Sequence, residues 1–318
     1  MERLIKKILF LTCIIFGLII IIMIIPGDES GYIFSDIEKI ERLHNLPSPK
    51  IILVGGSNIA MGVDSEILEK KMKIPVVNMG LHAGLGIRFL FERVRTNIKQ
   101  GDIVIISPEY ENFFNDFYNG FGPIIGGTIA ALPRHVQYIS NNKQVYLLIS
   151  NMNFILNARV FNLALFLIKR ITNNNVFLSY EAVYSRNSIN KWGDVVSHLK
   201  KNSPSLVLKD IPDFSVRINN YEIYNYLNEI NDYITSKGGF LYFSFPSFAE
   251  TVFKKNKKSI EAIFDCFRDK VKINHYDSPD MFIYKDQLFF DNYYHLNRKG
   301  RNKRTKMLLK NLQTIVKK

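Results

Sequence analysis

The chain has 318 residues, of which 47% are hydrophobic and 13% aromatic, and 42 lysines and arginines against 29 acidic residues give a formal charge of +13. This supply of core-forming side chains excludes intrinsic disorder for most of the chain. The two cysteines, Cys13 and Cys266, are too few for a disulfide framework or a four-thiolate metal site. The length fits one large domain or two small ones.

The N-terminal segment is long and apolar. Residues 8–25 carry no charge, and such a run is long enough for a helix to cross a hydrocarbon core of roughly 30 Å. Arg3, Lys6 and Lys7 precede it, so the positive-inside rule predicts that residues 1–7 are cytoplasmic and that the main domain is extracytoplasmic. A cleaved signal peptide is the alternative, but its apolar region is usually shorter, and no small-x-small cleavage site follows. We therefore predict a single-pass protein of the cell membrane with a retained transmembrane anchor.

The rest of the chain, residues 49–318, has the pattern of an α/β domain. Short apolar runs that end in turn residues alternate with helix-like stretches. This order predicts a doubly wound, flavodoxin-like fold in which a parallel sheet is the middle of three layers. The predicted strands cover 51–54, 75–78, 103–106 and 239–245, and the predicted helices cover 64–72, 86–100, 221–237 and 297–316. A stalk with a connecting helix around 37–46 is expected over residues 26–48.

Residues 117–205 do not continue the alternation of strands and helices. They include a long apolar stretch, 145–168, that is interrupted by asparagines and by Arg159. A second membrane span would place this arginine near the middle of the bilayer, at a cost of about 2.5–3.5 kcal/mol on insertion scales. We therefore expect a helical insertion that forms a lid or a membrane-proximal surface.

Polar residues follow the predicted strands, where ligands bind in open α/β sheets. Ser57 lies in a glycine turn after the first strand, and the second and third strands lead into 78–80 and 107–112. A serine in such a turn lies at a helix N-terminus, whose N–H groups stabilise an oxyanion. Near the end of the chain, His295 and Asp291 supply a general base and the carboxylate that orients it.

In these blocks the chain resembles the SGNH (GDSL-like) hydrolase superfamily, and within it the membrane-anchored members associated with acylation of cell-envelope polysaccharide and teichoic acid. The resemblance implies that Ser57 is the nucleophile, that His295 and Asp291 complete a triad, and that the backbone N–H of Gly80 contributes to the oxyanion hole. The family commonly has its aspartate three residues before the histidine. Here that residue is Asn292 and the aspartate is four before, so the role of Asp291 stays open.

The third block of the family usually supplies an asparagine side chain to the oxyanion hole. Here this block contains Glu109, and an ionised glutamate cannot donate a hydrogen bond. Either Asn112, Asn58 or a backbone group takes this role, or the hole has only two donors. Loss of one donor typically costs about 2.7–4 kcal/mol of transition-state stabilisation.

Other chemistries have less support in the sequence. Glu109 and Glu111 are two residues apart on a loop, so we expect them to point in different directions rather than to form a glycosidase pair. The histidines lack ligand spacing and no nucleotide-binding signature is present, so we expect neither a metal nor a cofactor. The basic segment 298–318 predicts an amphipathic helix docked on the sheet, with its basic face outward, rather than a nucleic-acid site.

These features predict a membrane-tethered, extracytoplasmic serine O-acyltransferase or esterase that acts through an acyl-enzyme. The family resemblance and the predicted location imply a cell-surface polysaccharide or related envelope polymer as its substrate. The altered third block motivates a second hypothesis, a non-catalytic scaffold that binds an envelope glycan or a membrane-bound acyltransferase partner. A flavodoxin-like cofactor binder ranks last, because residues 55–58 are a poor match to a phosphate-binding loop.

Overall fold

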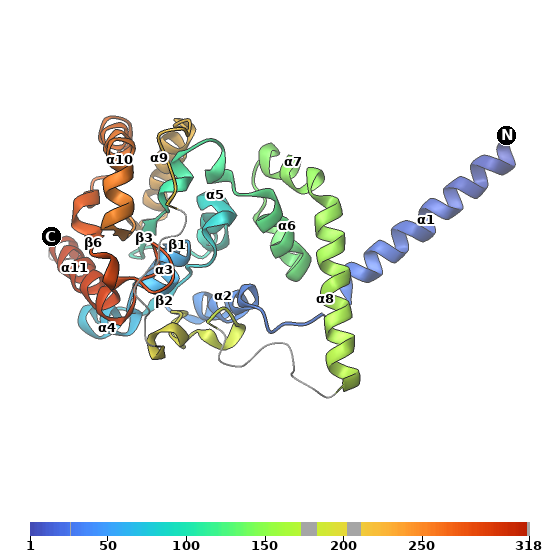
Figure 1. Cartoon of the computed structure of the whole chain (residues 1–318), viewed down its shortest axis with the longest axis horizontal. Helices are drawn as coiled ribbons and strands as arrows, with labels where there is room; N and C mark the ends of the chain where they lie inside the picture. Colours follow the sequence, from blue (N-terminus) through green and yellow to red (C-terminus); the bar gives the residue numbers. More distant parts are fainter. Residues whose placement is uncertain (26, 173–182, 202–210, 317–318) are drawn as a thin grey trace.

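The computed structural model describes residues 1–25, 27–172, 183–201 and 211–316. Its centre is a parallel sheet in the order β2-β1-β3-β4, preceded in the chain by an apolar helix (Figure 1). The protein is therefore a mixed α/β protein, as predicted, and the four strands lie where the sequence predicts them. They are β1 (Ile51–Gly55), β2 (Val76–Asn78), β3 (Ile103–Ser107) and β4 (Phe240–Phe243).

The strands form because they are short apolar runs that are buried on both faces. Every residue of β1, β2 and β3 is buried, the usual condition of strands in a parallel sheet covered by helices. The register pairs Leu53 of β1 with Ile105 of β3 and with Asn78 of β2. The loops that follow these strands therefore leave the sheet side by side. A separate parallel pair is formed by β5 (Phe248–Ala249) and β6 (Ile283–Tyr284).

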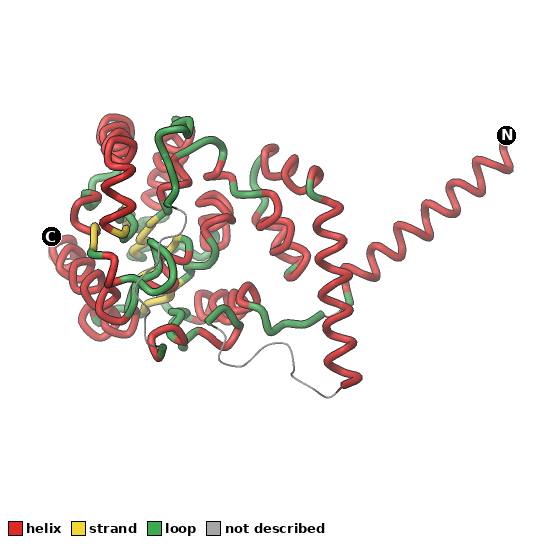
Figure 2. Tube along the Cα trace, viewed as in Figure 1, coloured by secondary structure: helices red, strands yellow, loops and turns green. Residues whose placement is uncertain are grey.

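Helices surround the sheet, and most lie where the sequence predicts them (Figure 2). The long helix α10 was not expected from the sequence. The helices of the body are α3 (Ser57–Gly62), α4 (Ser65–Met72), α5 (Gly86–Arg95), α9 (Glu222–Ser236), α10 (Glu250–Lys270) and α11 (Arg298–Val316). The expectation that the basic face of α11 points outward is partly wrong, because Arg301 and Arg304 are buried and donate hydrogen bonds inside the body.

The segment between β3 and β4 is largely helical. It contains α6 (Gly122–Ala131), α7 (Asn142–Ser150) and α8 (Met152–Thr172), which pack together at one side of the body (Figure 1). Part of the predicted insertion, residues 173–182 and 202–205, lies outside the described residues. Residues 183–201 return to the body, where the amide of Asn78 donates to the carbonyl of Trp192 at 2.8 Å.

The N-terminal helix α1 (Glu2–Ile24) extends away from the body (Figure 1). Among the described residues, it is the one helix that is long and apolar enough to cross a membrane. It begins before the predicted span and includes the three cations expected in the cytoplasm. The helix α2 (Asp36–Asn45) follows, at the place of the expected connecting helix, and it packs against β2.

A buried ionic cluster joins α2 to α5 and to the start of the helical insertion. Arg93 donates to both carboxylate oxygens of Asp36 and to the carbonyl of Met79, and His135 Nε2 lies 2.8 Å from Asp36 Oδ2. Burial alone would raise the pKa of Asp36, but the charge of Arg93 and the contact with His135 outweigh it and lower the pKa to about 2. The carboxylate is therefore charged in the folded protein at neutral pH.

We expect Asp36→Asn to lower the free energy of unfolding by about 3–5 kcal/mol, because Arg93 would stay buried without its counter-charge. The measurement is urea unfolding of the full chain in detergent, followed by the fluorescence of the single, buried Trp192. The matched control is Asp116→Asn, which removes an exposed partner of Lys143 and should cost less than about 1 kcal/mol. Equal losses in both variants would contradict the expectation.

Candidate active site

A cavity of about 730 Å³ lies where the loops after β1, β2 and β3 meet. The loop after β1 contributes Ser57, the loop after β2 contributes Leu81 to Ala83, and the loop after β3 contributes Glu109 and Glu111. His295, from the segment before α11, lines the same cavity. The structure thus brings the two main predicted catalytic residues into one cavity.

The turn after β1 is packed so tightly that it requires glycine. Ser57 is the first residue of α3, and Gly56 precedes it. A Cβ on Gly56 would lie 2.7 Å from the Ala83 Cβ and 2.8 Å from Glu109 Oε1. Only a residue without a side chain therefore lets the loops after β2 and β3 approach the serine.

Glu109 is the direct partner of Ser57. The hydroxyl of Ser57 donates to Glu109 Oε1 at 3.2 Å, and the backbone N–H of Asn58 donates to the same oxygen at 3.1 Å. Burial, followed by repulsion from Glu111, raises the pKa of Glu109 to about 8, although these two hydrogen bonds act against the increase. At neutral pH the neutral carboxyl group therefore predominates beside the serine.

The second glutamate, Glu111, lines the same cavity as Glu109. Its carboxylate accepts hydrogen bonds from the hydroxyls of Tyr294 at 2.6 Å and Tyr293 at 3.3 Å. Burial also raises the pKa of Glu111, against the effect of the Tyr294 hydrogen bond.

His295 is held on both sides of its ring. Its Nδ1 lies 2.7 Å from Asp291 Oδ1, while its Nε2 lies 3.1 Å from the amide nitrogen of Asn292. Asn292 Oδ1 accepts hydrogen bonds from the backbone N–H groups of Tyr294 and His295. These bonds fold the segment into a turn, which lets an aspartate four residues before the histidine reach its ring. Asp291 is thereby brought to the imidazole.

Tyr184 joins this group from the helical insertion. Its hydroxyl donates to Asp291 Oδ2 at 2.5 Å and lies 3.1 Å from His295 Nδ1. Burial raises the pKa of Tyr184, and the nearby aspartate raises it further. The tyrosine therefore remains a hydrogen-bond donor that fixes the orientation of Asp291.

In the described structure, the serine and the histidine do not hydrogen-bond each other. Ser57 Oγ donates to Glu109, and His295 Nε2 contacts Asn292. Nucleophile–base contacts are often long or misaligned until a substrate binds. Catalysis by this pair requires both side chains to exchange their present hydrogen-bond partners.

The predicted oxyanion donors make internal hydrogen bonds instead. The N–H of Gly80 donates to the side chain of Asn78 at 2.9 Å, and the side chain of Asn58 donates to Ser107 Oγ at 3.1 Å. The side chain of Asn112 donates to a backbone carbonyl of its own loop at 3.2 Å. Buried donors are satisfied in this way because an unpaired one costs about 1–3 kcal/mol. These three residues support the loops, and none is among the described residues that line the cavity.

Three further residues of the site could only partly be found in the sequence. Glu109 differs in the sequence from the pattern of the family that the chain resembles, but no local pattern reveals its burial. Tyr184 had no local signal, because it is 107 residues from Asp291. The sequence predicts Arg304 on the outer face of its helix, whereas it donates to the Asn58 carbonyl at 2.7 Å and to Ser107 Oγ at 2.9 Å, which ties the loops after β1 and β3 together.

Part of the cavity lining is apolar. It includes Pro123, Ile124 and Gly127 of α6, Phe154 of α8, and Tyr32. The cavity therefore combines reactive polar side chains with apolar surface. Such a lining suits a ligand with an acyl chain next to a polar bond.

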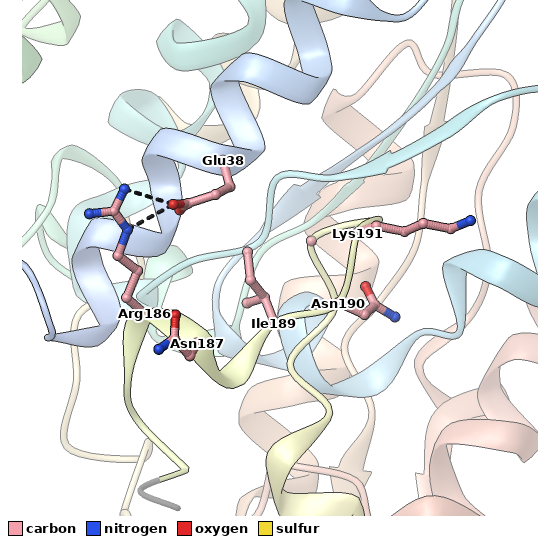
Figure 3. Close-up of a pocket in the computed structure, with 7 residues that line it drawn as sticks. Glu38, Arg186, Asn187, Ile189, Asn190 and Lys191 are labelled. Atoms are coloured by element: carbon pink, nitrogen blue, oxygen red, sulfur yellow. Dashed lines mark hydrogen bonds and ion pairs between the residues drawn. The ribbon is translucent and has the colours of Figure 1, made fainter. Parts of the chain in front are cut away.

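A smaller hollow of about 310 Å³ is lined by polar residues near α2 (Figure 3). Arg186 lies beside it, but its guanidinium is bound to Glu38 at 2.7 Å and to Glu29. Lys191 lies over the ring of Trp192. This hollow has no nucleophile next to a base among its lining residues, so we do not assign the chemistry to it.

Comparisons with protein-family models and with curated proteins gave no match for this chain. Among the described residues, no group of three or more histidines, cysteines or carboxylates is placed to hold a metal ion. The assignment of the site therefore depends on its geometry and chemistry.

We expect Glu109→Gln to stabilise the protein increasingly as the pH rises. The folded protein keeps the Glu109 proton up to a pKa of about 8, against the usual 4.5, so the stability linked to this proton is complete below pH 4.5 and is lost as the pH rises through 8. The difference in unfolding free energy between variant and wild type should change by a few kcal/mol between pH 5 and pH 9.

Urea unfolding across this pH range measures the effect. Glu41→Gln, at an exposed position, is the control and should follow the wild type. A constant difference between Glu109→Gln and wild type would contradict the buried, protonated state of Glu109.

Proposed function

We propose that this protein is a membrane-anchored serine O-acyltransferase or esterase of the SGNH type, acting on a cell-surface polysaccharide or related envelope polymer. The observation that carries the proposal is the shared cavity of Ser57 and His295, with the imidazole held by Asp291 at 2.7 Å. The parallel order β2-β1-β3-β4 supports the doubly wound, flavodoxin-like arrangement that the SGNH assignment requires.

In the proposed mechanism, the Nδ1–H of His295 donates to Asp291, which leaves the lone pair on Nε2. The Asn292 amide, which lies 3.1 Å from Nε2, moves aside. The Ser57 hydroxyl turns from Glu109 to Nε2, transfers its proton there and attacks the acyl carbon of the donor. The bond from the acyl carbon to the leaving group breaks, and the leaving group takes the proton from Nε2. A sugar hydroxyl, or water in the esterase reaction, then attacks the acyl carbon and gives its proton to His295 Nε2. The bond from the acyl carbon to Ser57 Oγ breaks, and His295 returns the proton to Ser57.

Glu109 supplies a hydrogen-bond donor to the oxyanion in this proposal. A neutral carboxyl group has an O–H that an ionised one lacks, and Glu109 Oε1 lies 3.2 Å from Ser57 Oγ. When the carboxyl group turns to the oxyanion, it also frees the N–H of Asn58. The departure of the third block from the family pattern is then a change of donor rather than the loss of one.

The proposed location places the catalytic domain outside the cytoplasm. The helix α1 crosses the membrane, residues 1–7 stay in the cytoplasm, and α2 and the body lie on the other side. Support comes from the apolar side chains of α1, which are exposed along the helix, and from the three cations at its start.

A second candidate function is a non-catalytic scaffold that binds an envelope glycan or a membrane-bound acyltransferase partner. It is favoured by the separate hydrogen bonds of Ser57 and His295 and by the internal bonds of the predicted oxyanion donors. Under this hypothesis the cavity binds a ligand and Ser57 is not activated.

Labelling with a fluorophosphonate distinguishes the two candidates. We expect the full chain in detergent to be labelled and Ser57→Ala to remain unlabelled. In His295→Ala the labelling rate should fall by about 100-fold or more, because a general base contributes roughly 10²–10⁴-fold. Ser236→Ala, which removes an exposed hydroxyl at the end of α9, should be labelled like the wild type. No labelling of a folded wild type would favour the scaffold.

The proposed role of Glu109 predicts a distinct pH profile of labelling. In the wild type the rate should fall as the pH rises through about 8, because Glu109 loses the proton that it donates. Glu109→Gln keeps a donor that does not titrate, so its rate should persist at pH 9. Glu109→Ala should be about 10²–10³-fold slower than the wild type below pH 8, and its own rate should not fall further between pH 8 and pH 9. A wild-type rate that stays constant from pH 7 to pH 9 would contradict this role.

A further inference from the structure

The outer face of α8 is apolar, and no described residue covers it. Exposed apolar side chains recur at the spacing of one helical face over three turns, which normally points into a protein core. The six residues of this face are Val160, Phe161, Ala164, Leu167, Ile168 and Ile171. A contiguous exposed surface of this kind marks an interaction site with a protein or a membrane.

The inner face of α8 fixes the direction in which the outer face points. Arg159 is buried and donates to the carbonyl of Ala130 in α6 at 3.3 Å and to that of Ile22 in α1 at 2.9 Å. Asn162 binds both backbone groups of Asp28, at 2.7 and 3.0 Å. These contacts hold α8 in one rotation, with the apolar face turned away from the body.

The junction between α1 and α8 is short and closely packed. A Cβ on Gly27 would lie 1.7 Å from Asn162 Oδ1, so the chain passes directly against α8 as it leaves α1. Lys169 holds the side chain of Asp28 at 2.8 Å. The helix α8 therefore runs across the end of α1, between it and the body (Figures 1 and 2).

We propose that the outer face of α8 lies in the interface of the lipid bilayer that α1 crosses. This inference rests on the proposed membrane anchor, because the end of α1 marks the bilayer surface and α8 is bound to that end. Apolar side chains of interfacial helices enter the headgroup and acyl boundary by about 5–10 Å. The helix contains no acidic residue and carries Arg170 exposed near its end, which favours anionic lipids.

The position of α8 also determines where the cavity lies relative to the bilayer. Phe154, in the first turns of the same helix, lines the cavity that contains Ser57. One side chain of the cavity lining is therefore part of the membrane-bound element, and the site is held near the bilayer surface. This arrangement suits a substrate that is carried by a lipid.

The test uses the full chain in vesicles of phosphatidylcholine and phosphatidylglycerol. Nitroxide labels are attached at Val160→Cys and Leu167→Cys in a background of Cys13→Ser and Cys266→Ser, and accessibility to oxygen and to a water-soluble nickel chelate is measured. Phe16→Cys in α1 and Lys258→Cys on exposed α10 are the bilayer and water controls. Trp192 fluorescence checks that each variant is folded.

We expect the ratio of oxygen to nickel accessibility at both α8 positions to exceed that of Lys258→Cys several-fold. A ratio equal to that of Lys258→Cys, with a high ratio at Phe16→Cys, would place α8 in water and overturn the inference while the anchor stands. Low accessibility to both reagents would place this face against protein, such as a second copy, and would also overturn it. A low ratio at Phe16→Cys would reject the anchor and, with it, the inference.

Discussion

The close approach of three loops around Gly56 is the constraint on which the site depends. Strand β1 lies between β2 and β3, so the loops after all three strands emerge together. They meet because Gly56 leaves room for Ala83 and Glu109 beside the first residue of α3. Arg304 then joins two of these loops from the last helix. The serine therefore lies at a point that three strands and the end of the chain determine jointly.

The sequence predicted the sheet well because fully buried parallel strands are continuous apolar runs, a signal that is local. It also predicted the position of Ser57, since residues after parallel strands share one edge of the sheet, and His295, from the segment before α11, lines the same cavity. It failed for contacts between distant segments. Tyr184 reaches Asp291 across 107 residues, and no local pattern distinguishes an amide that faces a cavity from one that, like Gly80, is used inside the fold.

The electrostatics of the cavity differ from those expected of its composition. Two glutamates two residues apart suggest a strongly anionic site, but burial raises the pKa of both. The hydroxyls of Tyr293 and Tyr294 donate to Glu111 and act against this increase. Beside His295, burial opposes the charge of Asp291 and the hydrogen bond from His295 favours it, so that the pKa of Asp291 is lowered. The site thus has one carboxylate that orients the base and one carboxyl group that retains its proton, a separation of roles set by their surroundings.

The short connection between α1 and the body has a mechanical consequence. Only three residues separate Ile24, the last residue of α1, from Asp28, whose backbone and side chain are bound to α8. Arg159 of α8 also donates to the carbonyl of Ile22 in α1, so direct contacts hold the two helices together. Rotation of α1 about its own axis and the direction in which the cavity opens are consequently a single degree of freedom. Any neighbouring helix that packs against one side of α1 would therefore determine the direction in which the cavity opens.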